Sequence, residues 1–506
     1  MSERSAKFAK RHVRSLALVL LAASCGGLSR NQMATSAPPS YAIAERTSAE
    51  SYHDWGKNPW VDASKDHLST FAADVDTASY TIARRKLNEG QLPPAAAVRV
   101  EEFVNYFRYA FPEPAQGSPF AVIMDAAPSP LVPDHMILRV GVGTRPRSPA
   151  EHKPAHLVFL IDVSGSMNEP DKLPLAKQSL KILTNNLGPR DTVSLVTYAG
   201  STRVILPPTG MDGQNRILAA IDELGASGST AMASGLDLAY SQAMLGLEPG
   251  VTSRVIVCTD GDTNVGPTSI EEIQRVIASR AKAGITLSTV GFGMGNYKDA
   301  LMEQLADKGN GNNFYIDSLA AAKRVFQDQL GANLEVVAKD VKLQVDFDPA
   351  QVAKYRLVGY ENRTVADDDF RNDKVDAGEI GPGHQVTAMY ELELTAQAKL
   401  TPAALGMVRI RHKAPEGADA ATEHTFAMAA PPAASFEAAA PDLQFAFAVS
   451  AFADLLRGQD DAKRWPLEAI EQVARATAGS DPDRGELVSL IEKARRLRGS
   501  AATVAR

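Results

Sequence analysis

One stretch near the middle of the chain, HLVFLIDVSGSM (156–167), constrains the fold more than any other. Its unbroken apolar run is typical of a strand that is buried on both faces, as in a parallel sheet. The run ends in Asp162, Ser164 and Ser166, three short side chains that each carry oxygen. In an open α/β sheet, ligands bind beyond the carboxyl ends of the strands. The stretch therefore predicts a ligand site at the end of a central strand.

Alternating strand and helix patterns around this stretch predict a doubly wound, mostly parallel sheet over residues 154–334. The apolar segments DTVSLVTYA, SRVIVCTD, GITLSTVGF and NNFYI are the further strands, with amphipathic patterns between them. Ser269 and Glu272 form a capping box that predicts the start of one of the helices. The connection 200–213 is too short for a crossover helix, so we expect an antiparallel edge strand there.

The segments on either side of this sheet have other patterns. Residues 59–153 are mixed α+β, residues 335–430 are rich in strands that suit a β-sandwich, and residues 431–506 are helical. Because strand patterns lie both before and after the sheet, we expect one sandwich to combine them. The predicted fold class is therefore α/β, with the doubly wound domain inserted in or flanked by a β-sandwich-type domain and with N-terminal and C-terminal helical segments.

The first residues have the composition of a bacterial secretion signal. Residues 1–24 carry five Lys/Arg and one Glu, and they include SLALVLLAAS, an apolar stretch too short to span a bilayer. The sequence LAASC resembles a lipobox, so we expect cleavage before Cys25 and a lipid on its thiol. Plain signal-peptidase cleavage or an uncleaved anchor are the alternatives. Residues 25–58 are small, polar and aperiodic, which predicts a flexible tether.

Charge and cysteine content limit the function further. The net charge is −7, and loss of five positive and one negative side chain with residues 1–24 would leave −11. This charge argues against nucleic acid as a partner. We expect a protein of the bacterial cell envelope, at the outer membrane or the periplasmic face, with its lipid as the only membrane attachment. The second cysteine, Cys258, lies in an apolar strand pattern and is predicted to be a buried core residue.

Two further loops are expected to reach the end of the central strand. Asp260 follows the strand SRVIVCTD, and Thr230 lies in the loop GASGST, just before a helix. The five side chains offer hard oxygen ligands only, which suit Mg²⁺, or Mn²⁺ or Ca²⁺, better than zinc or copper. Two carboxylates and neutral hydroxyls leave a dication under-compensated. We therefore expect an acidic oxygen from a protein partner to complete the metal shell.

D-x-S-x-S (Asp162, Ser164, Ser166), a loop threonine (Thr230) and T-D-G around Asp260 resemble the metal-ion-dependent adhesion site of von Willebrand factor A (VWA) domains. The resemblance implies that the three hydroxyls contact the metal and that the two aspartates act mostly through water. The stretches STFAADVDTASY, GYENR and DAGEIGPGHQVTAMYELEL also resemble YfbK-like bacterial VWA lipoproteins, from about residue 58 to 500.

The preferred hypothesis is a binding protein and not an enzyme. One alternative is a structural or assembly factor of the envelope with a vestigial metal site. Another is a Mg²⁺-dependent hydrolase, which the missing second adjacent carboxylate and the missing general base disfavour. DVDT (74–77) is similar to the nucleophile motif of haloacid-dehalogenase-type phosphatases, but its threonine comes one place early and the preceding FAA is a weak strand pattern. Helix capping by Asp76 or Thr77 is expected instead.

Overall fold

The computed structural model describes most of the chain after residue 49, and its described residues fall in one compact unit. The described ranges are 50–73, 76–115, 117–148, 151–228, 232–261, 269–295, 297–401, 403–415, 420–458 and 465–504. The predicted signal peptide (1–24) and Cys25 lie outside these ranges, so their roles stay predictions.

The described end of the predicted tether is packed against the rest of the protein. The Glu50 side chain is 4% exposed, and its Oε1 lies 2.7 Å from Nη2 of Arg85. The Asn58 side-chain amide donates hydrogen bonds to the backbone carbonyls of Leu357 (3.2 Å) and Gly359 (2.7 Å). This packing contradicts the predicted flexible tether for its last part, from residue 50 to residue 58.

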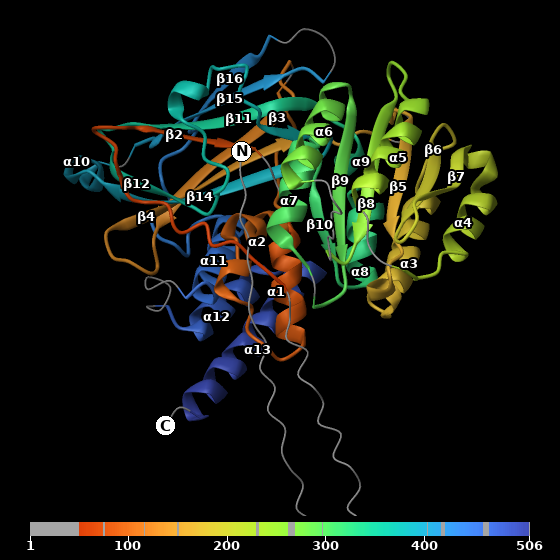
Figure 1. Ribbon diagram of the computed structural model, residues 1–506. Helices are drawn as coiled ribbons and strands as arrows, with labels where there is room; N and C mark the ends of the chain where they lie inside the picture. The colour runs from red at the N-terminus through yellow and green to blue at the C-terminus, as the bar shows by residue number, and fades with distance from the viewer. Residues whose placement is uncertain are drawn as a thin grey trace, which may run out of the picture. The chain divides into compact units, whose positions relative to one another are not determined.

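A six-stranded sheet forms the centre of the α/β domain (Figure 1). Its strand order is β10-β9-β8-β5-β6-β7, and all neighbours are parallel except β6 and β7. Every residue of β5 is buried, as its apolar run predicts. The antiparallel β7 confirms the edge strand predicted in the 200–213 connection. The strands are β5 (Ala155–Asp162), β6 (Thr192–Tyr198), β7 (Arg203–Gly210), β8 (Thr252–Thr259), β9 (Ile285–Phe292) and β10 (Asn313–Ile316).

Helices cover both faces of this sheet and close two apolar cores. α3, α4 and α8 contribute to one core, and α5, α6 and α7 to the other. The Ser269 hydroxyl accepts the backbone N–H of Glu272, which confirms the predicted start of α6. A π-helical segment, Arg324–Asp328, interrupts the last helix of the domain between α8 and α9. The bounds are α3 (Leu173–Asn185), α4 (Gln214–Asp222), α5 (Met232–Leu245), α6 (Ile270–Lys282), α7 (Asp299–Lys308), α8 (Leu319–Lys323) and α9 (Leu330–Leu334).

Two antiparallel sheets combine strands from both sides of the α/β domain. Their orders are β1-β12-β14-β4-β3 and β13-β11-β15-β16, with β2 also paired to β11. One apolar core lies between them, which confirms that the α/β domain is inserted in a sandwich. The strands are β1 (Val61–Asp62), β2 (Leu68–Ala72), β3 (Phe120–Pro128), β4 (His135–Thr144), β11 (Ala338–Phe347), β12 (Val352–Val358), β13 (Gly378–Ile380), β14 (Gln385–Leu394), β15 (Gly406–Lys413) and β16 (Thr422–Ala427).

Helices from the two ends of the chain share a further core. Tyr80 of α1 and Phe103 of α2 belong to the same buried cluster as Phe452 of α11 and Ile491 of α13. The sequence predicts both helical segments but not their common core, nor α12. No helix in the described ranges is long and apolar enough to cross a membrane. The bounds are α1 (Ala78–Asn88), α2 (Val100–Tyr106), α11 (Pro441–Leu456), α12 (Leu467–Thr477) and α13 (Pro482–Val504).

Asp76 joins the N-terminal segment to the α/β domain instead of capping α1. Its Oδ1 accepts the backbone N–H of Asn313, at the start of β10 (2.7 Å), and its Oδ2 accepts from Arg363 (2.9 Å). Thr77 occupies the N-cap position of α1 but makes no side-chain capping bond there. Thr77 is therefore confirmed as the N-cap residue, although its side chain makes no capping bond, and the prediction is wrong for Asp76. The segment before Asp76 does form a strand, β2, contrary to the weak pattern of FAA.

Candidate metal centre

The D-x-S-x-S segment makes a tight turn at the carboxyl end of β5. Asp162 is the last residue of the strand and is fully buried. Its Oδ1 accepts the backbone N–H of Ser164 (2.8 Å), which fixes the carboxylate against the turn. The hydroxyl oxygens of Ser164 and Ser166 lie 3.0 Å apart. Three oxygen-bearing side chains therefore meet where the strand ends.

The end of β8 lies next to this turn, because β5 and β8 are adjacent parallel strands. The Thr259 hydroxyl donates to Oδ2 of Asp162 (3.1 Å) and accepts the backbone N–H of Gly261 (3.1 Å). Thr259 thus connects the two strand ends and orients the Asp162 carboxylate from the side opposite Ser164. Asp260, the next residue, is 1% exposed. Sequence reasoning included Thr259 in a motif but gave it no role.

Thr230 lies outside the described residues, and its predicted contact with a metal stays a prediction. The residues just before it are bound to the D-x-S-x-S turn. The backbone N–H of Ser227 donates to the carbonyl of Val163 (2.6 Å), and that of Gly165 donates to the carbonyl of Gly228 (3.0 Å). Gly228 has φ +86°, and a Cβ there would lie 3.0 Å from the Gly200 nitrogen. Glycine at this position therefore allows the loop to pass close to Gly200, in the segment after β6.

Lys172 is a component of the site that the sequence pattern did not reveal. It occupies the N-cap position of α3, and its Nζ lies 2.8 Å from Oδ2 of Asp260. Both side chains are buried, so the ion pair is screened little by water. The only signal in the sequence is a lysine at the start of the helix that follows the D-x-S-x-S turn. The contact of Lys172 with Asp260 does not follow from this signal, because Asp260 comes after β8, much later in the chain.

Burial raises the pKa of Asp162 to about 6, and the negative charge of Asp260 adds to this effect. The hydrogen bonds from Ser164 and Thr259 act in the opposite direction, because they stabilise the carboxylate. A cation near Asp162 would favour the ionised form in the same way. Cys258 is a free, fully buried thiol on β8, and burial raises its pKa, which confirms its prediction as a core residue.

The donor set fits a hard divalent cation. Asp162 and Asp260 supply carboxylates, and Ser164 and Ser166 supply hydroxyls that already face one another. Oxygen donors of this kind are the ligands that Mg²⁺, Mn²⁺ and Ca²⁺ prefer. The described donors bring two negative charges, and Lys172 offsets one of them. The arrangement can therefore bind a cation that still attracts a further anionic oxygen.

A second buried acidic group, formed by Asp76, Glu102 and Glu303, lies between the α/β domain and the N-terminal helices. Each of its carboxylates contacts an arginine: Glu102 contacts Arg99, and the other two contact Arg363. Burial raises the pKa of Glu102 to about 7. These contacts make the group a junction between the inserted domain and its host.

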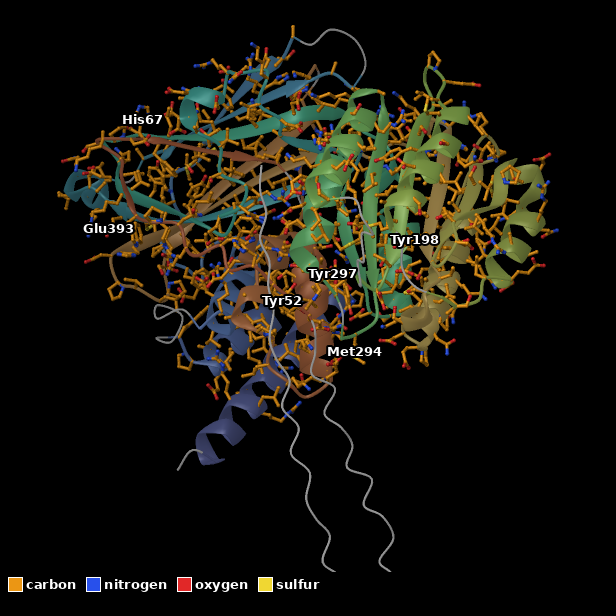
Figure 2. All side chains as sticks on the ribbon, viewed as in Figure 1. Tyr52, His67, Tyr198, Met294, Tyr297 and Glu393 are labelled. Atoms are coloured by element: carbon orange, nitrogen blue, oxygen red, sulfur yellow. The ribbon has the colours of Figure 1, made fainter. Side chains whose placement is uncertain are left out.

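The N-terminal segment reaches the loop that follows β9, beside the end of β8. The backbone N–H of Gly295 donates to Oε1 of Glu50 (3.0 Å), and the N–H of Ser51 donates to the carbonyl of Tyr297 (3.2 Å). Tyr52 packs against the buried cluster that contains Tyr297 (Figure 2). In the same view, the half-exposed Met294 lies at the tip of this loop (Figure 2).

A doubly wound sheet that carries D-x-S-x-S and T-D-G at the carboxyl ends of adjacent strands defines a VWA domain, and the family model described as von Willebrand factor type A domain matches residues 156–328. Proteins of this class act by binding other proteins, and their domains commonly bind a divalent metal. Two more family models match the flanks: von Willebrand factor over residues 46–139, and Uncharacterized protein YfbK, C-terminal, over residues 332–497.

The chain belongs to the YfbK family of VWA proteins. The YfbK protein of Escherichia coli strain K12 is 39% identical over 469 residues, which cover 88% of this chain and 80% of that protein. The human inter-alpha-trypsin inhibitor heavy chain H4 is 30% identical over 183 residues, 35% of this chain and 18% of its own. A solved von Willebrand factor type A structure from Catenulispora acidiphila is 18% identical, with a TM-score of 0.42, and the match covers 74% of this chain and 89% of that one.

Proposed function

We propose that the protein is a lipid-anchored cell-envelope protein that binds an acidic residue of a partner protein through a divalent metal. Mg²⁺ is the metal that we expect first, before Mn²⁺ or Ca²⁺. One observation carries the proposal. The Asp162 carboxylate is oriented on both oxygens, by the Ser164 N–H and the Thr259 hydroxyl, beside two serine hydroxyls 3.0 Å apart. An oriented carboxylate next to paired hydroxyls is a preorganised set of oxygen donors.

Each residue has a distinct part in the proposed binding. Ser164, Ser166 and Thr230 would hold the cation by their hydroxyls, and Asp162 and Asp260 would balance its charge. When bound, the cation would supply an electrophilic position that an oxygen of the partner can fill. Thr259 would keep the Asp162 carboxylate in place, because its hydroxyl is fixed in turn by the Gly261 N–H.

The last helix of the VWA domain offers a route by which binding could reach the rest of the protein. Arg324, at the start of the π-helical segment, contacts Asp483 of α13, and its guanidinium lies 4.1 Å from the ring centroid of Tyr106. We infer that a shift of α8 and α9 on ligand binding would be passed to the helical core through these contacts. If α8 and α9 occupied the same positions with and without an acidic ligand, this route would be wrong and the protein would act by adhesion alone.

The proposal includes no catalytic step. A Mg²⁺-dependent hydrolase would gain support only from turnover of phosphate esters that disappears in Asp162→Ala. The alternative of an assembly factor with a vestigial metal site is favoured by one observation. The Lys172 ammonium already lies 2.8 Å from Asp260 and offsets its charge.

Calorimetric titration of the full-length protein with Mg²⁺ and Mn²⁺ tests the metal site. We expect binding in the wild type and at least a tenfold weaker affinity in Ser164→Ala. Ser194→Ala is the matched control, because the Ser194 hydroxyl is buried on β6 without a hydrogen-bond partner in the described part of the chain. No binding by the wild type, either without or with acetate as a carboxylate ligand, would favour the vestigial site.

Two more experiments address the partner and the anchor. A pull-down from envelope extract should retain a partner in Mg²⁺ but not in EDTA, and Ser164→Ala should lose it. Fractionation of cells should find the wild type with membranes and Cys25→Ser free of them. A Cys25→Ser protein that stays with the membrane would contradict the lipid anchor and leave the metal site unaffected.

A further inference from the structure

Two separate parts of the chain, the start of α3 and the loop after β9, hold Lys172 in the metal centre. Its backbone carbonyl accepts the N–H of Ala176 (2.8 Å) at the start of α3, which fixes where the side chain begins. The side chain then runs past Gly293, just beyond the end of β9, to reach Asp260. A Cβ at Gly293 would lie 2.1 Å from Cγ of Lys172, and Gly293 has φ +73°. The loop after β9 therefore leaves room for this lysine only because it carries glycine.

The ammonium changes the charge balance of the site. Among the described residues of the site, Asp162 and Asp260 carry two negative charges and Lys172, whose Nζ lies 2.8 Å from Asp260, offsets one of them. A dication would then leave one positive charge in a place with little water, which is unfavourable. A single carboxylate from outside cancels that charge. Without the lysine, the two aspartates would offset more of the charge of the dication, and the loaded site would attract a further anion less strongly.

We propose that Lys172 makes the binding of the metal and of an anionic ligand depend on each other. This inference rests on the proposed metal site and adds how the site is regulated. Lys172 lowers the affinity for the metal alone, since a cation must approach a fixed ammonium, and it raises the affinity of the loaded site for a carboxylate. By linkage, the carboxylate must strengthen metal binding by the same factor. Lys172 is thus a positioning and charge-setting residue, and it suppresses loading without a partner.

The first test uses the wild type alone, with acetate as the carboxylate probe. Mn²⁺ is titrated into the full-length protein by calorimetry, with and without saturating acetate at constant ionic strength. We expect acetate to lower the apparent Kd for Mn²⁺ at least fivefold. An apparent Kd that acetate leaves unchanged would overturn the inference. This result does not depend on how well a variant folds.

The second test removes the charge. Lys172→Met keeps an apolar stem beside Gly293, and we expect it to bind Mn²⁺ at least tenfold more tightly than the wild type and to lose the acetate effect. Lys181→Gln is the matched control, because it changes the net charge equally on the same helix, where Lys181 pairs with Asp222 at the surface. Its Mn²⁺ affinity and acetate effect should equal those of the wild type.

The outcomes separate this inference from the proposed function. Equal Kd values for Lys172→Met and the wild type would overturn the role of Lys172 and leave the metal site standing. Binding by Lys172→Met without acetate, and by the wild type only with acetate, would support the inference, since the ammonium would then suppress loading in the absence of a carboxylate. If neither protein bound Mn²⁺ in the presence of acetate, the metal site and the inference would both be wrong.

Discussion

Nη2 of Arg84 lies 2.6 Å from Oδ1 of Asp317, and this buried ion pair joins helix α1 to the segment that opens the last helix of the VWA domain. A second nitrogen of the same guanidinium lies 3.1 Å from Oε2 of Glu486 on α13. One arginine from the start of the chain therefore holds the inserted domain against a helix from its end. The pair sits on the route by which we propose that α8 and α9 pass on a binding event.

Asp317→Asn should lower the free energy of unfolding by about 3 kcal/mol, because it leaves the buried Arg84 guanidinium without its main counter-charge. Urea denaturation followed by circular dichroism measures this loss. Arg371→Gln is the control, because its ion pair with Glu423 is exposed and pairs of this kind contribute less than about 1 kcal/mol. Equal effects of the two substitutions would contradict the role of the buried pair.

Thr259→Val should weaken Mn²⁺ binding by roughly 10–100-fold, because the Asp162 carboxylate loses the hydroxyl that orients it. Calorimetry on the full-length protein gives the two Kd values. The control is Thr286→Val, which removes a buried hydroxyl that has no hydrogen-bond partner in the described ranges. Thr286→Val should keep the wild-type affinity, and a loss in both variants would point to a general effect on the β-sheet.

Gly291→Ala should destabilise the protein by about 1–3 kcal/mol, because a Cβ on this β9 residue would lie 2.2 Å from Cε2 of Tyr297. Thermal denaturation compares it with Gly485→Ala on α13, where a Cβ meets no atom within 4 Å. Alanine should stabilise that helix by roughly 0.5–1 kcal/mol. A melting temperature for Gly291→Ala at or above that of the wild type would show that the loop after β9 adapts easily.

Glu50→Gln should release the N-terminal segment from the loop after β9. Burial acts to raise the pKa of Glu50, but the charge of Arg85, the N–H of Gly295 and Lys86 together outweigh it and lower the pKa to about 2, so the side chain is charged at neutral pH. Hydrogen exchange of residues 51–56 should rise in the variant, since the neutral side chain loses both ion pairs. Asp54→Asn, at an exposed site in the same segment, keeps a side-chain oxygen that can accept the Gly56 N–H (2.9 Å from Oδ1 of Asp54), and it should exchange like the wild type.

His384 should make stability depend on pH between about 6.5 and 4. Burial, and to a smaller extent the charge of Arg108, lower its pKa to about 4, and its Nδ1 is buried without a hydrogen-bond partner among the described residues. The unfolded chain binds a proton on this ring at higher pH than the folded one. The neutral His384 ring therefore makes its full contribution to the free energy of unfolding above pH 6.5. This contribution decreases as the pH falls from 6.5 to about 4.

Urea denaturation at pH 7 and at pH 5 measures this dependence. We expect His384→Asn to lose about 1–2 kcal/mol less between the two pH values than the wild type does. His53→Asn, at an exposed position, should follow the wild type. A variant of His384 with the full wild-type pH dependence would show that this ring is protonated equally in both states.

The amino-acid sequence by itself determined the class of the central domain and most of its candidate metal centre. Continuous apolar runs alternate with amphipathic helical patterns, and this order predicts a parallel sheet with helices on both faces. Adjacent parallel strands end at one edge, so the residues that follow β5 and β8 had to meet. This is why Asp162, Ser164, Ser166 and Asp260 could be placed from their local context alone.

Only the tertiary structure decided which distant residues complete and support that edge. The Lys172 contact depends on Gly293, the Glu50 contact on the loop after β9, and the Arg84 contact on Asp317, which is 233 residues further along the chain. Periodicity in a sequence reports which face of an element is buried, but not which element covers it. Buried ion pairs of this kind follow from the packing of whole elements, because a charge loses its water only when another part of the chain closes over it.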